Sequence, residues 1–457
     1  MIVLPMAGRT ADRMARSKII AGVAAVLLVA GCGAFVLVWR PAIAAVAPAS
    51  STSFRPDLIR RGRDLAAIGN CNTCHTVRDG KDFAGGLPVP TPFGTIFSTN
   101  ISPDRETGIG GWSEAAFRRA MQAGVDRDGR HLYPTFPYDH FTSISDDDDR
   151  ALYAFLMTRE PVQAPARQND VSFPFNQRWL IAGWKLLFLR HGAYQPDPTK
   201  SAEWNRGAYL VNGLAHCGAC HTPRNALGAE RADASFSGGD VDNWQAYPIN
   251  NRSPAPVRWD RQALLAYLRQ GWHTDHGTAR GPMAEVVSNL SSVPESDVAA
   301  IATYMADVYG SPPGQNETPP ATRDVAASSG DPGAAIYAAA CASCHESARP
   351  LPYGGVDLSR STAISASDPR NLANTVIAGV QPVAGERSAI MPAFGNSMDD
   401  RQIASLLVYL RARFGKGPAW TNLDETIKQA RQTQTAYLQT TAGPLTAPVD
   451  ASQRDKP

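Results

Sequence analysis

Six of the chain's seven cysteines lie in three Cys-x-x-Cys-His pentapeptides, spaced about one domain length apart. Their cysteines and histidines are Cys71, Cys74 and His75; Cys217, Cys220 and His221; Cys341, Cys344 and His345. This spacing is typical of c-type haem attachment, in which two thioethers anchor the haem and the adjacent histidine reaches the iron. A redox dithiol, a disulfide or half of a zinc site would explain one such motif. Three copies predict three covalently bound haem c groups.

A haem iron held by one histidine can take a second axial ligand, and methionine is a common choice. Predicted helices end at Gly271 and Gly379, and a methionine follows each glycine after twelve residues, at Met283 and at Met391. Because two repeats share this offset, we predict that Met283 and Met391 bind the second and third irons. A neutral thioether favours ferrous iron, so this ligation would raise the haem potential.

The first repeat departs from this pattern, because the residue twelve positions after Gly124 is Phe136. His140 lies four residues further on and could supply a nitrogen ligand, which would lower the potential relative to the methionine-ligated haems. Met121 or His131 could substitute from nearby, or the iron could stay five-coordinate and open to small molecules. Our leading hypothesis is that His140 is the sixth ligand of the first haem.

Helices must position these residues, and their pattern repeats along the chain. A short helical pattern with a glycine precedes each haem motif, at Gly62, Gly207 and Gly333. Second helices are predicted over 112–124, 259–271 and 371–379, and closing apolar helices over 151–157, 298–309 and 403–414. Capping boxes are predicted at Ser145, Ser292 and Ser397. We expect a mostly α fold of three tandem class-I-like cytochrome c domains behind an N-terminal membrane segment.

The predicted boundaries follow from these repeats and from shifts in composition. We expect a basic cytoplasmic N-terminus (1–18), a membrane anchor or signal segment (19–38), domain one (56–162), an aromatic and basic segment (163–200), domain two (201–311), a Pro/Ser/Ala linker (312–330), domain three (331–417) and a polar tail (418–457). The aromatic and basic segment suits packing between the first two domains. It equally suits an interface with a partner subunit or with the membrane surface.

The segment Ile19–Val38 carries no charge and is long enough to span a bilayer. Basic residues are concentrated before it, which predicts a cytoplasmic N-terminus and haem domains on the periplasmic side of the cell (inner) membrane. Two alternatives stay open. Ala-x-Ala patterns within Ala42–Ala47 would suit a cleaved signal peptide, and Cys32 lies in a loose lipoprotein-like pattern.

Composition and the absence of catalytic motifs exclude two classes of function. The 457 residues have a formal net charge of +2 and 43% hydrophobic content, which fits ordinary globular modules and does not indicate nucleic-acid binding. The sequence shows no nucleophile–base pair, phosphate loop or flavin motif. We therefore identify no catalytic residues and no site for turnover of an organic substrate.

The chain resembles the triple-haem cytochrome c subunits of membrane-bound periplasmic dehydrogenases from about Arg60 to Phe414. The most specific stretches are 98–112, 132–134, 182–188, 204–210, 217–225, 281–286 and 391–395. The resemblance implies that the chain takes electrons from a separate catalytic dehydrogenase and passes them to ubiquinone or a terminal oxidase. That partner would be a quinoprotein alcohol or aldehyde dehydrogenase, a flavoprotein such as a gluconate dehydrogenase, or a molybdenum hydroxylase.

The sequence around Phe136 differs between groups of this family that serve different dehydrogenases. Many alcohol-oxidising members have a methionine where this chain has Phe136. The Phe-Pro-Tyr-x-His-Phe form around His140 looks more like cytochromes paired with molybdenum hydroxylases of aldehydes or N-heterocycles. Two rival functions remain: a peroxidase-like enzyme with an open first haem, and a cytochrome subunit of an oxidase complex.

Overall fold

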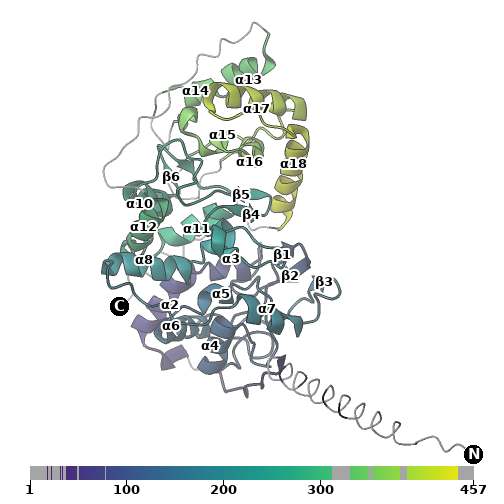
Figure 1. The fold of residues 1–457 in the computed structure, drawn as a ribbon, viewed down its shortest axis with the longest axis vertical. Helices are drawn as coiled ribbons and strands as arrows, with labels where there is room; N and C mark the ends of the chain where they lie inside the picture. The colour runs from purple at the N-terminus through teal and green to yellow at the C-terminus, as the bar shows by residue number, and fades with distance from the viewer. Residues whose placement is uncertain are drawn as a thin grey trace, which may run out of the picture.

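The computed structural model describes residues 38–48, 51–77, 79–310, 330–347, 354–380 and 389–440, with isolated positions between them. Most of the predicted segment Ile19–Val38, including Cys32, lies outside the described residues, as does nearly all of the linker 312–330. Within the described part, no helix is both long and apolar enough to cross a membrane. The fold is mostly helical, as predicted, with short antiparallel strands (Figure 1).

The first repeat has a three-stranded sheet beside its helices. Its elements are α2 (Pro56–Ile68), α3 (Cys71–His75), β1 (Pro88–Thr91), β2 (Gly94–Phe97), α4 (Glu114–Ala123), α5 (Tyr138–Phe141), α6 (Asp146–Met157) and β3 (Asp170–Val171), with α7 (Leu180–Phe188) following. The predicted second helix is confirmed as α4, which ends at Gly124 in the left-handed conformation (φ 59°). Ser145 caps α6 by accepting the N–H of Asp148, as predicted.

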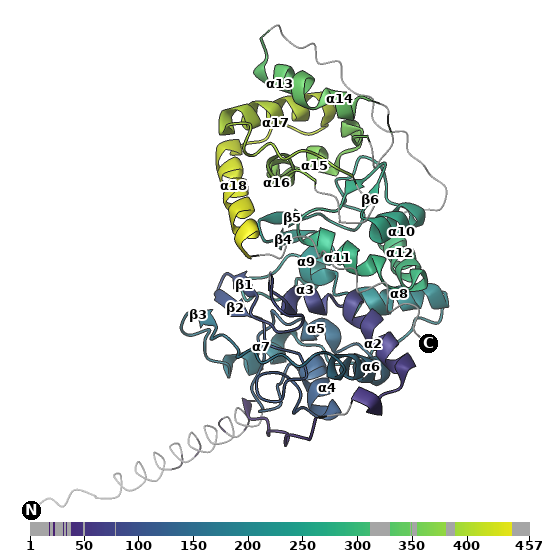
Figure 2. The same cartoon turned by 180° about the vertical axis from the view of Figure 1, so that it is seen from behind.

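The second and third repeats follow the same order of helices. The second contains α8 (Ala202–Asn212), α9 (Gly218–His221), β4 (Gly239–Val241), β5 (Trp244–Ala246), α10 (Arg261–Gln270), β6 (Trp272–His273), β7 (Gly277–Thr278), α11 (Pro282–Ser291) and α12 (Glu295–Tyr309). The third contains α13 (Pro332–Ala340), α14 (Ala342–His345), α15 (Thr362–Ser365), α16 (Arg370–Ala378), α17 (Asp400–Phe414) and α18 (Leu423–Thr440). The last helix packs on α16 and α17 along one side of the molecule (Figure 2).

Two predicted capping boxes are wrong. Helix α12 begins after Pro294, and Ser292 instead ends the preceding helix α11. Helix α17 begins after Asp399, whose side chain accepts the N–H of Gln402 in a complete capping box. A carboxylate one position before the helix competes successfully with Ser397 for the first-turn N–H groups.

The three glycines that precede the haem motifs mark helix crossings. Each lies in the first helix of its repeat, at the point where that helix crosses the closing helix. A Cβ built on Gly62, Gly207 or Gly333 would lie 1.9, 1.9 or 2.2 Å from the carbonyl oxygen of Ala151, Ala300 or Ser405, respectively. Such a distance is far inside van der Waals contact, so only glycine allows these backbones to approach this closely. The same crossing therefore occurs three times.

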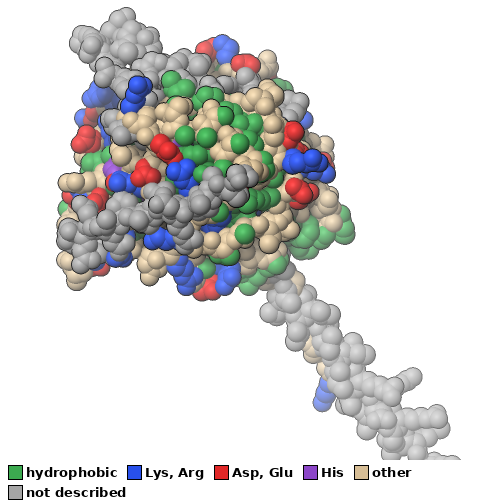
Figure 3. Space-filling model, turned by 90° about the horizontal axis from the view of Figure 1, so that it is seen from above, with side chains coloured by type: hydrophobic (Ala, Val, Ile, Leu, Met, Phe, Trp, Pro, Cys, Tyr) green, Lys and Arg blue, Asp and Glu red, His purple; other side chains and the backbone are tan. Residues whose placement is uncertain are grey.

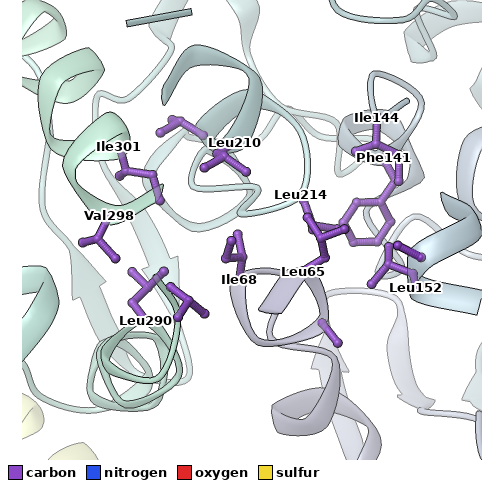
Figure 4. Close-up of a cluster of buried hydrophobic side chains, with 14 of the residues drawn as sticks. Leu65, Ile68, Phe141, Ile144, Leu152, Leu210, Leu214, Leu290, Val298 and Ile301 are labelled. Carbon is purple, nitrogen blue, oxygen red and sulfur yellow. The ribbon is translucent and has the colours of Figure 1, made fainter. Parts of the chain in front are cut away.

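The hydrophobic core is divided unevenly among the repeats. One cluster runs without interruption through the first and second repeats, joining Leu65 and Ile68 of α2 to Leu210 of α8 and Ile301 of α12 (Figure 4). A separate cluster, built around Ile377 and its neighbours, serves the third repeat and α18. The first two repeats thus share one core, and the third has its own.

Candidate haem centres

Each haem motif lies on a helix of about one turn, namely α3, α9 and α14. Because cysteines three positions apart on a helix point to the same side, the two sulfurs of each motif can face one planar group. None of these six cysteines forms a disulfide. Burial raises the pKa of Cys71 and of Cys217 to about 12. A redox dithiol needs a lowered thiol pKa, so the first two pairs do not fit that alternative.

The three motif histidines are held in one common way. In each ring, Nδ1–H donates a hydrogen bond to a backbone carbonyl: His75 to Thr99 at 2.6 Å, His221 to Tyr247 at 2.7 Å and His345 to Val356 at 2.8 Å. Since Nδ1 carries the proton, Nε2 keeps its lone pair for a metal. The rings are therefore oriented and in the tautomer that a proximal haem ligand requires.

Burial and close packing support the same use of these rings. Burial lowers the pKa of His75 and of His221, which keeps both rings neutral, as metal ligation requires. In the third repeat, a Cβ on Gly355 would lie 2.8 Å from Nδ1 of His345. That glycine therefore leaves the space in which the imidazole lies.

The two predicted methionine ligands share a hydrophobic cluster with their own haem motif. Met283 lies in the first turn of α11 and packs against the shared core, as does Cys217. Met391 packs against the third core, to which Cys341 belongs. Their backbones differ, however, because Met391 lies in an extended bridge with Val380 rather than in a helix. The equal offset of twelve residues therefore does not reflect an equal local structure.

His140 is hydrogen-bonded on both sides of its ring. Nδ1–H donates to the carbonyl of Asn212 at 2.9 Å, and Nε2–H donates to Glu230 at 2.7 Å. Burial opposes a charge on this ring, but the hydrogen bond to Glu230 together with the negative charges of Glu230 and Asp139 outweighs it and raises the pKa of His140. A ring that donates from both nitrogens has no lone pair for iron. Ligation by His140 would therefore require the ring to lose a proton and leave Glu230.

The other residues considered for the first iron lie in packed positions. Phe136 contacts the ring of Phe141, with centroids 5.3 Å apart. Met121 is buried in the shared core. His131 is also engaged at both nitrogens: Nε2–H donates to the carbonyl of Val38 at 3.0 Å, and Nδ1 accepts from Lys185 at 3.1 Å.

Hydrogen bonds join the surroundings of the first and second haem motifs. His216 immediately precedes Cys217, and its Nε2–H donates to the carbonyl of Gly69, two residues before Cys71, at 3.3 Å. Asn289, on the helix that carries Met283, donates to the side chains of Asn70 at 2.8 Å and Thr73 at 3.1 Å. These contacts cross from one repeat to the other beside the motifs, so groups bound there would be neighbours.

The second and third repeats meet through side-chain amides. Asn371 of α16 forms a pair of hydrogen bonds with the backbone of Gln245 in β5: its Oδ1 accepts the N–H at 2.9 Å, and its Nδ2 donates to the carbonyl at 2.8 Å. Asn374 donates to the carbonyl of Asn243 at 2.9 Å. Gln245 is two residues from Tyr247, the partner of His221. The contact between repeats therefore adjoins the second haem motif.

Two further side chains in the second repeat fit a haem. Both nitrogens of His276 and Nε1 of Trp272 are buried without a hydrogen-bond partner. The His276 ring stacks on Trp259 at 3.5 Å. The indole N–H of Trp272 and the one N–H of the neutral His276 ring need acceptors, and the carboxylates of a haem supply acceptors of the right type. From its place in the loop before Met283, the sequence favoured a solvent-facing position or one near a haem edge for His276, and it gave Trp272 no role.

Comparison with known families gives a match over residues 328–410. The matching family is described as "Cytochrome C oxidase, cbb3-type, subunit III". The match covers α13, the third haem motif, Met391 and most of α17. The third repeat is therefore a cytochrome c domain.

Longer similarities extend over most of the chain. The chain is 36% identical to the fructose dehydrogenase cytochrome subunit of Gluconobacter japonicus, over 84% of the length of each protein. It is 36% identical to the gluconate 2-dehydrogenase cytochrome c subunit of Pantoea cypripedii, covering 83% of this chain and 90% of that subunit. It is 46% identical over 88% of its length to a subunit of the nicotinate dehydrogenase of Pseudomonas putida, and it spans about a third (34%) of that longer protein.

Proposed function

The chain belongs to the family of cytochrome c subunits of dehydrogenases, and from this we propose that it relays electrons through three covalent haem c groups. The electrons would come from a partner dehydrogenase and leave to the respiratory chain, with ubiquinone or a terminal oxidase as acceptor. The observation that carries this proposal is the threefold hydrogen bond from histidine Nδ1 to a backbone carbonyl. It prepares three equivalent metal ligands next to three cysteine pairs.

When bound, haem supplies reversible one-electron chemistry at its iron, while the protein sets the potential and the spacing. His75, His221 and His345 would be the proximal ligands. Met283 and Met391 would complete the second and third sites with a neutral sulfur. The contacts beside the motifs hold neighbouring sites together, which keeps the steps of a relay short.

The repeats correspond to three tandem cytochrome c domains over 56–162, 201–311 and 331–417. The threefold helix crossing at glycine supports this division, since each crossing brackets one haem motif. The shared core of the first two domains makes them one packed pair, and the third domain is joined to that pair through α16 and β5.

For the first haem we keep His140 as the candidate sixth ligand. The competing arrangement is the one seen here, in which His140 donates to Glu230; in that arrangement the first iron would take no nitrogen from His140. These two states differ by one proton and one ring displacement. A variant that removes the Glu230 carboxylate would favour ligation over the ion pair.

We further propose that the partner is a dehydrogenase of N-heterocyclic substrates related to nicotinate. Two observations support this choice: the similarity to the nicotinate dehydrogenase subunit of Pseudomonas putida, and the Phe-Pro-Tyr-x-His-Phe sequence at Phe136. The uncharged segment 19–38 would hold the chain in the cell membrane, with the haem domains on the periplasmic side.

The test is a redox titration of the full, haem-loaded chain, followed by magnetic circular dichroism and electron paramagnetic resonance. We expect three haems per chain, two of them with histidine–methionine ligation. Met283→Leu and Met391→Leu should each change one haem and lower its potential, whereas Met398→Leu in the third core should change neither. Fewer than three haems per chain would refute the relay. A high-spin first haem that binds cyanide and turns over peroxide would favour a peroxidase-like function instead.

A further inference from the structure

Helix α7 buries its one charged side chain and exposes two leucines, the opposite of what is usual for a helix that faces water. Its one charged side chain, Lys185, is only 9% exposed, whereas the adjacent Leu186 and Leu187 are 67% and 60% exposed. A surface helix normally turns its leucines inward and its lysine outward, because that arrangement buries apolar area and keeps the charge hydrated. The reversed arrangement indicates that the outer face of α7 meets an apolar environment.

Specific hydrogen bonds stabilise the inward position of the Lys185 side chain. Its ammonium group donates to the carbonyls of Ala123 at 2.8 Å and Gly124 at 2.5 Å, at the C-terminal end of α4. The carbonyl end of a helix attracts a cation, which compensates part of the cost of burial. Burial still lowers the pKa of Lys185 to about 7. The lysine therefore fixes α7 in an orientation that leaves its leucines outside.

Aromatic side chains extend the exposed apolar face. Trp179 precedes α7, and Phe173 and Phe175 lie on the segment that leads to it; all three are exposed. We name these three residues, with Leu186 and Leu187, the α7 patch. A cluster of exposed large apolar side chains on one segment marks an interaction surface rather than ordinary variation.

The segment that carries the α7 patch contains basic residues and no acidic ones. Between Asp170 and Asp197 the chain contains Arg178, Lys185 and Arg190 and no acidic residue. The face at the opposite end, seen in Figure 3, has basic and acidic side chains interspersed. Exposed tryptophan and leucine side chains on a segment whose charged residues are all basic are typical of helices that lie in the interface of an anionic bilayer.

The α7 patch is also connected to the residue where the proposed membrane segment ends. His131 donates to the carbonyl of Val38 through Nε2 and accepts from Lys185 through Nδ1. One imidazole therefore bridges the last residue of that segment and the inner face of α7. Arg119 of α4 donates to the carbonyl of Pro41 at 2.7 Å, which fixes the following residues on the same end of the molecule (Figure 1).

We propose that the α7 patch lies in the headgroup region of a lipid bilayer, beside the point where the chain leaves the membrane. The inference rests on the membrane segment in the proposed function. A single span leaves the attached domains free to tilt, whereas a second, in-plane contact at α7 fixes their orientation. The first haem domain, which contacts α7 through α4, would then be the one held nearest the lipid surface.

The test uses spin labels on the full, haem-loaded chain in lipid discs of phosphatidylcholine and phosphatidylglycerol. In a Cys32→Ser background, one nitroxide is placed at Leu187→Cys. The matched control is at Val408→Cys, an exposed apolar position on α17 (52% exposed). A third label at Ala25→Cys reports on the membrane segment itself. Collision with oxygen, which concentrates in lipid, is compared with collision with a polar nickel chelate, which stays in water.

We expect the Leu187 label to lose collision with nickel and to gain collision with oxygen, while the Val408 label does the reverse. Nickel access at Leu187 equal to that at Val408 would overturn the inference. Protection from both reagents would also overturn it, since that result indicates a protein cover. If Ala25 proves accessible to nickel, the membrane segment fails, whereas a buried Ala25 with an exposed Leu187 refutes only the α7 contact. Leu186→Cys replaces Leu187→Cys if the latter does not retain its haem spectrum.

Discussion

Asn371→Ala should loosen the contact between the third repeat and the second without unfolding either core. The Asn371 side chain makes two hydrogen bonds to the backbone of Gln245, and it is itself buried. Each lost bond to a partly buried backbone group costs about 1–1.5 kcal/mol, so the contact should weaken by about 2–3 kcal/mol. At 1.4 kcal/mol per tenfold, the fraction of molecules with the third repeat undocked should rise roughly 30- to 150-fold.

Two measurements check this value on the haem-loaded chain. Thermal unfolding followed by calorimetry should show the transition of the third repeat moving down by several degrees, since its core is separate. Flash-induced reduction should show slower electron arrival at the third haem. The control is Asn396→Ala, which changes an exposed asparagine in the same repeat. If Asn371→Ala and Asn396→Ala give the same melting profile and the same transfer rate, the amide pair does not hold the two repeats together.

Three other predictions concern single positions. Gly207→Ala places a Cβ against the Ala300 carbonyl and should lower the free energy of unfolding in urea by about 3 kcal/mol. The control Gly183→Ala, on the open face of α7, should not destabilise the protein, and equal effects of the two variants would exclude close helix approach as the cause. Burial raises the pKa of Asp149 to about 8, above its unfolded value near 4, so the free energy of unfolding should fall as pH rises from about 4 to 8. Asp149→Asn should flatten this pH dependence in urea titrations, and an unchanged slope would contradict the assignment. Glu230→Gln should promote nitrogen ligation of the first haem in magnetic circular dichroism, and a spectrum unchanged in both Glu230→Gln and His140→Ala would remove His140 from the iron.

Local signals in the sequence predicted the local structure well. The helix ends at Gly124 and Gly271 are confirmed, since a left-handed residue after an apolar face depends on few other residues. The cap at Ser397 failed because the neighbouring Asp399 competes for the same donors. Both outcomes were decided within one helical turn.

Features that depend on distant residues could not be predicted in this way. The ion pair of His140 with Glu230 joins residues 90 positions apart. The inward turn of Lys185 depends on the carbonyls at the end of α4, about 60 residues earlier in the chain. The short strands and the common core of the first two repeats likewise arise from packing between segments. The sequence indicated the residues of the haem motifs, but not the hydrogen bonds that join their surroundings.

The continuous core of the first two repeats has a consequence for how the protein is made. A ribosome delivers residues in order, and the surroundings of the first haem motif include Asn289, which donates to the side chains of Asn70 and Thr73. Nearly three hundred residues must therefore appear before that motif is fully enclosed, because contacts of long sequence separation close last. Until then the proposed attachment of haem to its cysteines would meet less steric hindrance. The third motif is enclosed by the core of its own repeat, so this repeat would fold independently of the first two.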